Sequence, residues 1–256
     1  MKVYCCQLDI AWENKEENYR KVRSLVEEAR PEAGSMVVLP EMFSTGFSMN
    51  VPGVAEEGST GGEKFLRDIA TEYGVTVVAG LVTRGPDGKG LNEAVVISPR
   101  GELLARYAKI HPFSLGGELE NYSRGKKIQG FQWNGIKVVP FICYDLRFPE
   151  VFRSAVRDGA EMFVVIANWP NKREQHWVTL LQARAIENLA YVVGVNRAGE
   201  DPKLVYPGRT MIVDPHGNVL ADAGLQEGMI SATIEPEVVR GWRKDFPALQ
   251  DFHWKD

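Results

Sequence analysis

Short apolar runs alternate with amphipathic stretches along the chain, and this alternation constrains the fold more than any other feature of the sequence. The runs have the length of β-strands, are rich in valine and isoleucine, and cover residues 36–40, 75–82, 137–143, 161–168 and 191–196. Several stretches between them place apolar residues at helical spacing. Continuous apolar strands are typical of sheets buried on both faces. The strands are too many for one simple wound sheet, so we predict an α/β fold with two stacked sheets and helices outside.

The amphipathic stretches predict the helices. Asn14, with Glu17 three residues later, resembles a capping box at the start of the first helix, although Asn replaces the usual Ser or Thr. The other helices are expected over residues 63–73, 149–158 and 176–190, with a last short one near Val238. Further strands are expected over residues 3–10, 91–97, 103–107, 210–214 and 229–234.

Composition and charge narrow the class of protein. No low-complexity tract or block of charge interrupts the 256 residues, so we predict a single domain over residues 1–256. The formal net charge of −4 argues against a nucleic-acid partner. No apolar run approaches the roughly 20 residues that span a bilayer, so no membrane association is expected.

The cysteines and histidines show no pattern of a disulfide framework or a metal site. Cys5 and Cys6 are neighbours on a predicted strand and therefore point to opposite faces, which makes a disulfide framework unexpected. We infer a reducing, cytoplasmic setting. The four histidines lie far apart, without the spacing of metal ligands, so we expect no metal.

Three predicted strands end in a polar, reactive residue. Glu41 lies in the segment VVLPEMF, Lys109 in ARYAKIHPF and Cys143 in VVPFICYDLRFPE. In an open α/β sheet, ligands gather at the carboxyl ends of the strands, so these ends could bring a carboxylate, an ammonium and a thiol together.

The three groups together form a coherent catalytic set. A thiol is a weak nucleophile until it loses its proton, and Glu41 could accept that proton from Cys143 in a dry site. Lys109 would add a fixed positive charge that stabilises a developing oxyanion, together with a backbone N–H just after the cysteine. We also expect helix-end N–H groups to lower the pKa of Cys143.

Taken singly, each of the three residues also fits an ordinary structural role. A cysteine at the end of a strand is commonly a small buried hydrophobe. A glutamate after proline is commonly a surface cap or a member of a salt bridge, and a lysine beside Ile and His is commonly solvated. Periodicity places these residues on the chain, but it does not show that they meet.

Three short motifs of the sequence resemble motifs of a known protein family. PEMF at 40–43, KIHPF at 109–113 and CYDLRFPE at 143–150 resemble the catalytic signatures of the nitrilase (carbon–nitrogen hydrolase) superfamily. ANWP at 167–170 and the segments 176–197 and 208–221 are similar to the bacterial omega-amidase branch. The resemblance implies a four-layer αββα sandwich, usually paired as a homodimer. It also implies hydrolysis of a non-peptide C–N bond without metal or cofactor.

The resemblance also assigns roles to four residues. Glu41 matches the general base, Lys109 the cation on the oxyanion side and Cys143 the nucleophile of the family. Family members carry a second glutamate before an aromatic residue and a glycine. Here that segment is GGELENYSRG, in which Glu118 is the best match and Glu120 the competitor.

The omega-amidase resemblance implies a substrate class. Such enzymes act on the terminal amide of 2-oxo dicarboxylic acid monoamides, such as 2-oxoglutaramate and 2-oxosuccinamate, and release the 2-oxo acid and ammonia through a cysteine thioester. Other members of the superfamily act on N-carbamoyl compounds or aliphatic amides, and these remain alternatives. A third hypothesis is a non-catalytic binding protein of the same fold, against which the intact Glu41, Lys109 and Cys143 argue.

A substrate of this class carries a carboxylate, which a cation in the pocket would bind. Arg173, Lys172 and the nearby His176 are candidates, and a solvated charged turn explains them equally well. Arg147 lies four residues after the cysteine, and there we expect it to pair structurally with an acid such as Asp145 or Glu150.

The walls of the pocket are expected to be aromatic, which would favour a short linear substrate. An apolar wall discriminates chain length only weakly, by about 1–3 kcal/mol per methylene. The expected wall residues are Phe43, Phe47, Tyr144 and Trp169.

Overall fold

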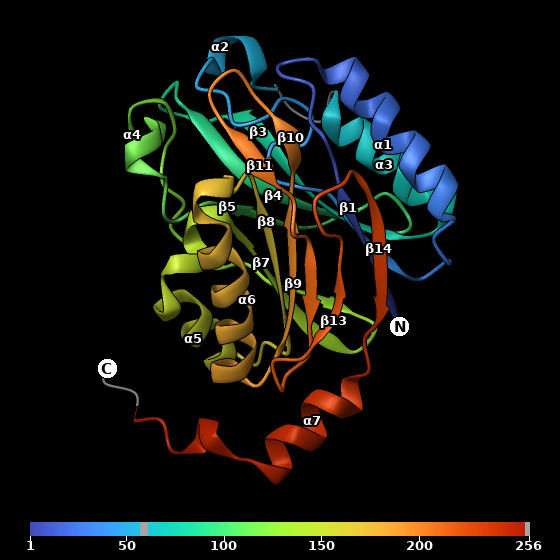
Figure 1. Cartoon of the computed structure of the whole chain (residues 1–256), viewed down its shortest axis with the longest axis vertical. Helices are drawn as coiled ribbons and strands as arrows, with labels where there is room; N and C mark the ends of the chain where they lie inside the picture. The colour runs from blue at the N-terminus through green and yellow to red at the C-terminus, as the bar shows by residue number, and fades with distance from the viewer. Residues whose placement is uncertain (57–60, 254–256) are drawn as a thin grey trace.

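The computed structural model describes residues 1–56 and 61–253. Two six-stranded sheets lie face to face, and helices cover the outer face of each sheet (Figure 1). In order across the first sheet the strands are β14 (Gly228–Thr233), β1 (Lys2–Gln7), β2 (Met36–Val38), β3 (Thr76–Arg84), β4 (Gly90–Ile97) and β5 (Leu103–Ala108). In order across the second they are β13 (Val219–Asp222), β12 (Met211–Val213), β9 (Tyr191–Asn196), β8 (Met162–Ala167), β7 (Ile136–Ile142) and β6 (Phe131–Trp133).

The helices form the two outer layers. The first sheet is covered by α1 (Lys15–Ala29) and α3 (Gly62–Tyr73), and the second by α5 (Pro149–Arg157) and α6 (Glu174–Asn188). The other helices are α2 (Val51–Val54), α4 (Glu118–Asn121) and α7 (Pro236–Asp245), with 3₁₀ turns η1 (Ser114–Gly116), η2 (Cys143–Arg147), η3 (Asn171–Arg173) and η4 (Ala248–Gln250). The predicted αββα architecture is confirmed.

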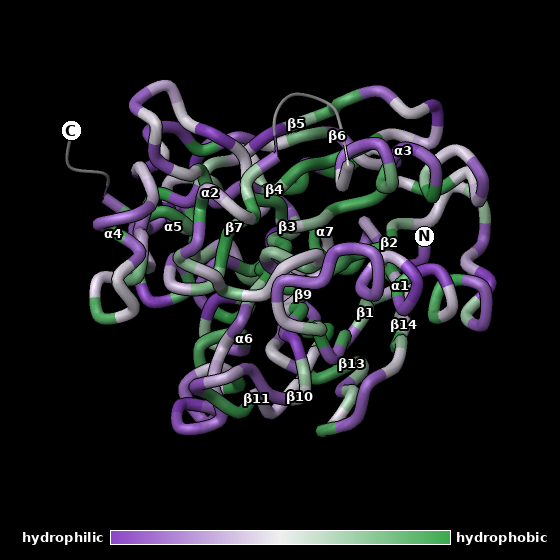
Figure 2. Tube along the Cα trace, turned by 90° about the horizontal axis from the view of Figure 1, so that it is seen from above, coloured by the Kyte–Doolittle hydropathy of each residue, from purple (hydrophilic) through white to green (hydrophobic). Residues whose placement is uncertain are grey.

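The strand β1 shows how the layers are built. Val3 and Cys5 lie in the core between the two sheets, whereas Tyr4 and Cys6 pack in the layer between the first sheet and its helices. Both cysteines are buried and free. Alternate residues of one strand therefore serve two separate cores, as its period of two requires. Figure 2 shows hydrophobic residues concentrated on strands such as β3, β4 and β7 in the middle of the molecule.

Local signals in the sequence set several element boundaries. The side chain of Asn14 accepts a hydrogen bond from the backbone N–H of Glu17 at 3.2 Å, so Asn14 caps α1 as expected. The expected strand over residues 3–10 is shorter than predicted and ends at Gln7. Beyond it, the carbonyl of Leu8 accepts from the N–H of Ala198, so the chain leaves the sheet to meet the hairpin of β10 (Ala198–Glu200) and β11 (Val205–Pro207).

The strand directions bring several chain segments to one edge of the sandwich. β2 and β3 run parallel, and β5 returns to the same direction because β4 is antiparallel to both of its neighbours. In the other sheet β7, β8 and β9 are parallel. The segments that follow β2, β5, β7 and β8 therefore leave the sheets at carboxyl ends, where the site lies. Within the described residues, no helix combines the length and the apolar character needed to cross a bilayer.

Candidate active site

Glu41, three residues beyond the end of β2 at Val38, is completely buried and fully engaged in hydrogen bonds. Its Oε1 accepts from Lys109 Nζ at 2.9 Å and from Asn92 Nδ2 at 2.7 Å. Its Oε2 accepts from the backbone N–H of Asn168 at 2.8 Å. Strands from both sheets therefore hold the carboxylate in one orientation.

Lys109 follows β5 and lies between two carboxylates. Its Nζ is 2.9 Å from Glu41 Oε1 and 2.9 Å from Glu118 Oε2, and its side chain is 1% exposed. Burial alone lowers the pKa of Lys109, but the charges of Glu118 and Glu41 outweigh burial and raise it well above its ordinary value. The ammonium is therefore a permanent positive charge in the site.

Glu118, not Glu120, reaches this cluster. Glu118 begins α4 and is completely buried, and besides Lys109 it accepts from the backbone N–H of Phe113 at 2.5 Å. Glu120 is exposed to solvent. Gly125 lets the chain pass against β5, because a Cβ there would lie 1.9 Å from the carbonyl oxygen of Ala108, next to Lys109.

Cys143 occupies a strained turn at the end of β7. Its φ is +45°, a left-handed conformation that is uncommon for any residue except glycine and that clusters at functional sites. Burial raises the pKa of its thiol well above the ordinary value, Glu41 raises it further, and Lys109 opposes them. The pKa is raised overall, so the resting group is a thiol that needs a base. The expected contribution of helix-end N–H groups stays a prediction.

The turn of Cys143 is tied to the segment of Lys109 by the buried carboxylate of Asp145. Asp145 Oδ2 accepts from the N–H of Ile142 at 3.0 Å and from the hydroxyl of Tyr107 at 2.8 Å. Its Oδ1 accepts from the N–H of His111 at 3.0 Å and contacts the ring Nδ1 of His111 at 2.8 Å. The residues on either side of Lys109 are thereby fixed against the residue before the cysteine.

The site also contains two asparagines, Asn168 and Asn92, which were not predicted from the sequence. Asn168 follows β8, and its Nδ2 donates to the carbonyl of Glu41 at 2.7 Å, while its own carbonyl lies 4.0 Å from Cys143 Sγ. Asn92 lies in β4 and contacts both glutamates. The available signal was a polar residue in a largely apolar strand, because buried polar groups need partners.

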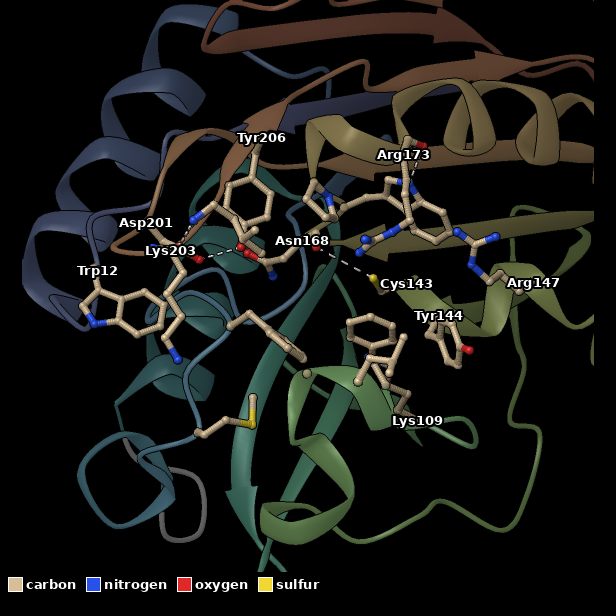
Figure 3. A pocket seen from close by; sticks show the side chains of 18 residues that line it. Trp12, Lys109, Cys143, Tyr144, Arg147, Asn168, Arg173, Asp201, Lys203 and Tyr206 are labelled. Atoms are coloured by element: carbon tan, nitrogen blue, oxygen red, sulfur yellow. Dashed lines mark hydrogen bonds between the residues drawn. The ribbon is translucent and has the colours of Figure 1, made fainter.

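A cavity of about 430 Å³ opens onto Cys143 and Lys109 (Figure 3). In Figure 3, Arg147 and Arg173 lie on one side of Cys143, and Trp12 and Lys203 lie on the other side. The expected wall residues that line this cavity are Phe47, Tyr144 and Trp169.

Two arginines on one side of the cavity have no acidic partner among the described residues. Arg147 lies over the ring of Trp169 at 4.8 Å, and Arg173 lies over the ring of Phe113 at 5.3 Å. Burial lowers the pKa of Arg147, and the neighbouring charge of Arg173 lowers it further. Within residues 1–56 and 61–253, neither guanidinium lies in salt-bridge distance of a carboxylate. Such an uncompensated pair is suited to an anion.

The expected structural role of Arg147 is therefore wrong. Asp145 uses both of its oxygens on other donors, and Glu150 is exposed. Arg147 instead lines the cavity, and its Nη2 lies 3.1 Å from Nδ1 of His176 outside the lining. Because arginine only donates, the imidazole of His176 accepts here.

Phe43 and His176 do not line the cavity. Phe43 is completely buried and packs against the rings of Tyr19 and Phe65 beneath the outer helices, so its expected place in the pocket wall is wrong. His176 is exposed, lies outside the lining and contacts it only through Arg147. Lys172 is exposed and also lies outside the lining.

The described residues of the site do not form a group of metal ligands. Among the side chains of the described ranges, no three His, Cys, Asp or Glu residues form a group that could hold one. What the arrangement can do follows from its own groups: a thiol, a buried carboxylate that accepts its proton, and a fixed ammonium beside both.

Known proteins resemble this chain over nearly its whole length. The 2-oxoglutaramate amidase of Bacillus subtilis is 34% identical over 97% of this chain and 96% of its own length. The omega-amidase YafV of Yersinia enterocolitica is 35% identical over 98% of this chain and 96% of its own length. The solved structure of XC1258 from Xanthomonas campestris, a CN-hydrolase superfamily protein with an arsenic adduct in its active site, covers 100% of this chain and 98% of that chain with a TM-score of 0.93 and 31% identity. The family model for carbon-nitrogen hydrolases matches residues 2–244, and the chain belongs to this family.

Proposed function

We propose that this protein is an omega-amidase that hydrolyses the terminal amide of 2-oxo dicarboxylic acid monoamides, such as 2-oxoglutaramate and 2-oxosuccinamate. One observation carries the proposal: the cavity that is lined by Cys143 and Lys109 also holds two arginines without an acidic partner among the described residues. The resemblance to the amidases of Bacillus subtilis and Yersinia enterocolitica supports the same substrate class.

Acylation begins with a proton transfer, because the raised pKa of Cys143 keeps it a thiol. Glu41 accepts the proton as the sulfur attacks the amide carbonyl, and a C–S bond forms while the carbonyl π-electrons move onto oxygen. The ammonium of Lys109 and the backbone N–H of Tyr144 stabilise this oxyanion. Both donors are already in place, so little reorganisation is needed in the transition state.

The oxyanion then collapses and expels the nitrogen. Glu41 returns its proton to the departing nitrogen, the C–N bond breaks, and ammonia leaves a thioester on Cys143. Water attacks the thioester while Glu41 accepts one of its protons, and the C–S bond breaks. Glu41 then returns this proton to the sulfur, which releases the carboxylic acid and restores the thiol.

Glu118 contributes to this catalytic cycle by holding the ammonium of Lys109. It supplies the second carboxylate of a buried Glu–Lys–Glu cluster, with Lys109 Nζ within 3.1 Å of both of its oxygens. The bidentate contact fixes the direction of the ammonium toward the cavity and orients the incoming water. Removing one partner of such a buried cluster leaves an uncompensated charge, which costs about 3–5 kcal/mol.

The substrate carboxylate is assigned to Arg147 and Arg173. Both side chains are partly exposed in the cavity, and their mutual repulsion is relieved when an anion lies between them. Phe47, Tyr144 and Trp169 form apolar walls along the path from the cysteine. An amide at one end and a carboxylate at the other define a short, linear, monoanionic substrate.

The direct test is ammonia release from 2-oxoglutaramate, measured beside aliphatic amides, N-carbamoyl amino acids and nitriles. We expect 2-oxoglutaramate to give the highest kcat/KM. Carbon dioxide released together with ammonia would instead identify a carbamoyl substrate. Rapid turnover of an uncharged amide, with none of 2-oxoglutaramate, would reject the assignment.

The extent of the cavity favours a second candidate in the same reaction class. Beyond Cys143, away from the arginines, the cavity continues along Trp12 and Lys203 (Figure 3). This space could hold a substituent on the leaving nitrogen, in which case the enzyme would release an amine instead of ammonia. A higher kcat/KM for N-substituted than for primary amides of 2-oxoglutarate would favour this candidate.

Assembly and location are further proposals. A homodimer is expected from the family resemblance, and sedimentation velocity would reveal it as a species of twice the chain mass of 28.6 kDa. The free thiols of Cys5, Cys6 and Cys143 support a reducing, cytoplasmic setting. Partition of the protein with the soluble cytoplasmic marker on cell fractionation would test this location.

A further inference from the structure

Asn92 contacts all three charged members of the buried cluster. It lies near the start of β4 and is 2% exposed. Its Nδ2 donates to Glu41 Oε1 at 2.7 Å and to Glu118 Oε1 at 2.8 Å. Its backbone carbonyl accepts from the N–H of Lys109 at 2.9 Å. One residue therefore touches the side chains of both glutamates and the backbone of the lysine between them.

The charge balance of the cluster explains why such a neutral donor is needed. The two carboxylates of Glu41 and Glu118 repel each other, and the single ammonium of Lys109 attracts both. Attraction toward one point does not fix the distance between the carboxylates. The amide nitrogen of Asn92 has two N–H groups in a fixed plane, and each one holds a different carboxylate.

The orientation of the Asn92 side chain follows from the same contacts. Ionised carboxylates only accept hydrogen bonds, so the amide nitrogen must face them and the amide oxygen must point away. That oxygen is buried and has no hydrogen-bond partner among the described residues. A buried acceptor without a partner lowers the free energy of unfolding. Such a cost in stability is typical of a residue that is retained for its function.

We infer that Asn92 is a positioning residue that sets the separation of Glu41 and Glu118 around Lys109. This inference rests on the proposed function, in which Glu41 moves the protons. The groups that face the side chain are Glu41 after β2, Lys109 after β5 and Glu118 in α4, with Tyr122 at the end of α4 close to both carboxylates. Asn92 does not line the cavity, so it acts through the glutamates.

The test compares Asn92→Asp with Asn92→Ala and with a matched control, Asn188→Asp. Asn188 is also a completely buried asparagine with an unpartnered amide oxygen, and its Nδ2 lies 3.4 Å from the carboxylate of Glu187, but it lies in α6 outside the site. The measurements are kcat and KM for 2-oxoglutaramate from pH 5 to 9, normalised to folded protein. The rate at which iodoacetamide alkylates Cys143 gives a readout that needs no substrate.

Asn92→Asp should lower kcat by about 10²-fold at pH 8, because a third carboxylate displaces Glu41 by a distance on the order of 1 Å. Its activity should recover toward pH 5, where the protonated aspartic acid again donates to one glutamate. Asn92→Ala should lower kcat at every pH and leave KM within twofold, because Asn92 does not line the cavity. Both variants should slow alkylation, and Asn188→Asp should match the wild type in every measurement.

The inference is overturned if both Asn92 variants keep kcat within threefold of the wild type, or if Asn92→Asp shows a pH profile parallel to that of the wild type. Should Asn92→Asp not fold, the kcat and KM of Asn92→Ala decide alone. A wild type that hydrolyses no amide, beside Asn92 variants with slowed alkylation, would reject the proposed function and leave the positioning role in place. An active wild type with unaltered alkylation in both variants would reject the positioning role only.

Discussion

Gly80 tests whether the position of Glu41 is set by the backbone that packs behind it. The residue lies in the middle of β3, where its N–H donates to the carbonyl of Pro40 at 3.1 Å and its carbonyl accepts from Phe43 at 3.2 Å. A Cβ at this position would lie 2.4 Å from the backbone nitrogen of Met42 and 2.5 Å from Glu41 Cα. Gly80→Ala therefore pushes directly on the chain that carries Glu41, the proposed general base.

The size of the effect follows from these distances. Ordinary contact of a Cβ begins near 3.4 Å, so the backbone nitrogen of Met42 must retreat by about 1 Å, from 2.4 to about 3.4 Å, in a tightly packed interior. A misplacement of about 1 Å can lower kcat by about 10²-fold, which corresponds to about 2.7 kcal/mol in activation free energy. The overpacking should also lower the free energy of unfolding by about 1–3 kcal/mol.

The assay measures kcat for ammonia release and the free energy of unfolding in urea for the same preparations. Gly241→Ala is the control, because a Cβ there meets no heavy atom within 4 Å and alanine should stabilise α7 by about 0.5–1 kcal/mol. A Gly80→Ala enzyme that is destabilised but retains wild-type kcat would refute the reasoning. It would mean that the carboxylate keeps its place when its backbone moves.

The remaining predictions concern the charges of the site. Lys109→Ala should abolish turnover and cost about 3–5 kcal/mol of unfolding free energy in urea titrations, because two buried carboxylates lose their counter-ion. The pKa of Lys109 is raised above 10.5, so this stabilisation should be fully present at neutral pH and decline only as pH rises through the folded-state pKa. Arg173→Ala should raise KM for 2-oxoglutaramate at least tenfold, about 1.4 kcal/mol, whereas Lys172→Ala should leave KM unchanged. In Glu41→Gln, alkylation of Cys143 by iodoacetamide should still be rising at pH 9, because burial raises the thiol pKa above 9.0; a plateau below pH 8 would contradict the buried-thiol description.

Much of the site was accessible from the sequence because parallel strands impose a common direction. Glu41, Lys109 and Cys143 each follow an apolar run, and the carboxyl ends of such strands meet at one edge. The structure brings them together as this rule implies, and Glu118 joins them through its contact with Lys109. The catalytic roles remain predictions that the experiments above test.

Other features depended on side-chain directions that periodicity does not reveal. Phe43 lies two residues after Glu41, but Met42 has a φ of +45°, so the chain turns there and the ring enters the layer beneath the outer helices. Arg147 faces the cavity because the Asp145 carboxylate is already occupied by donors from β5, β7 and the loop after β5.

The partners of Asn92 could not be predicted from the sequence for a different reason. Its partners Glu41 and Glu118 lie 51 and 26 residues away along the chain, and the three meet only because β4 runs antiparallel between β3 and β5. A single polar residue in a strand predicts that a partner exists, but the identity of the partner depends on the sheet order.

In the proposed mechanism Cys143 forms a thioester, and acid quenching in the first turnover would trap it. Wild-type enzyme is mixed with 2-oxoglutaramate, quenched within milliseconds, digested and examined by mass spectrometry. We expect an acyl group on the peptide that contains Cys143, with Cys5 and Cys6 unmodified, and no acyl group in Cys143→Ala. Full turnover by Cys143→Ala, or an acyl group on a different residue of the active wild type, would contradict this mechanism.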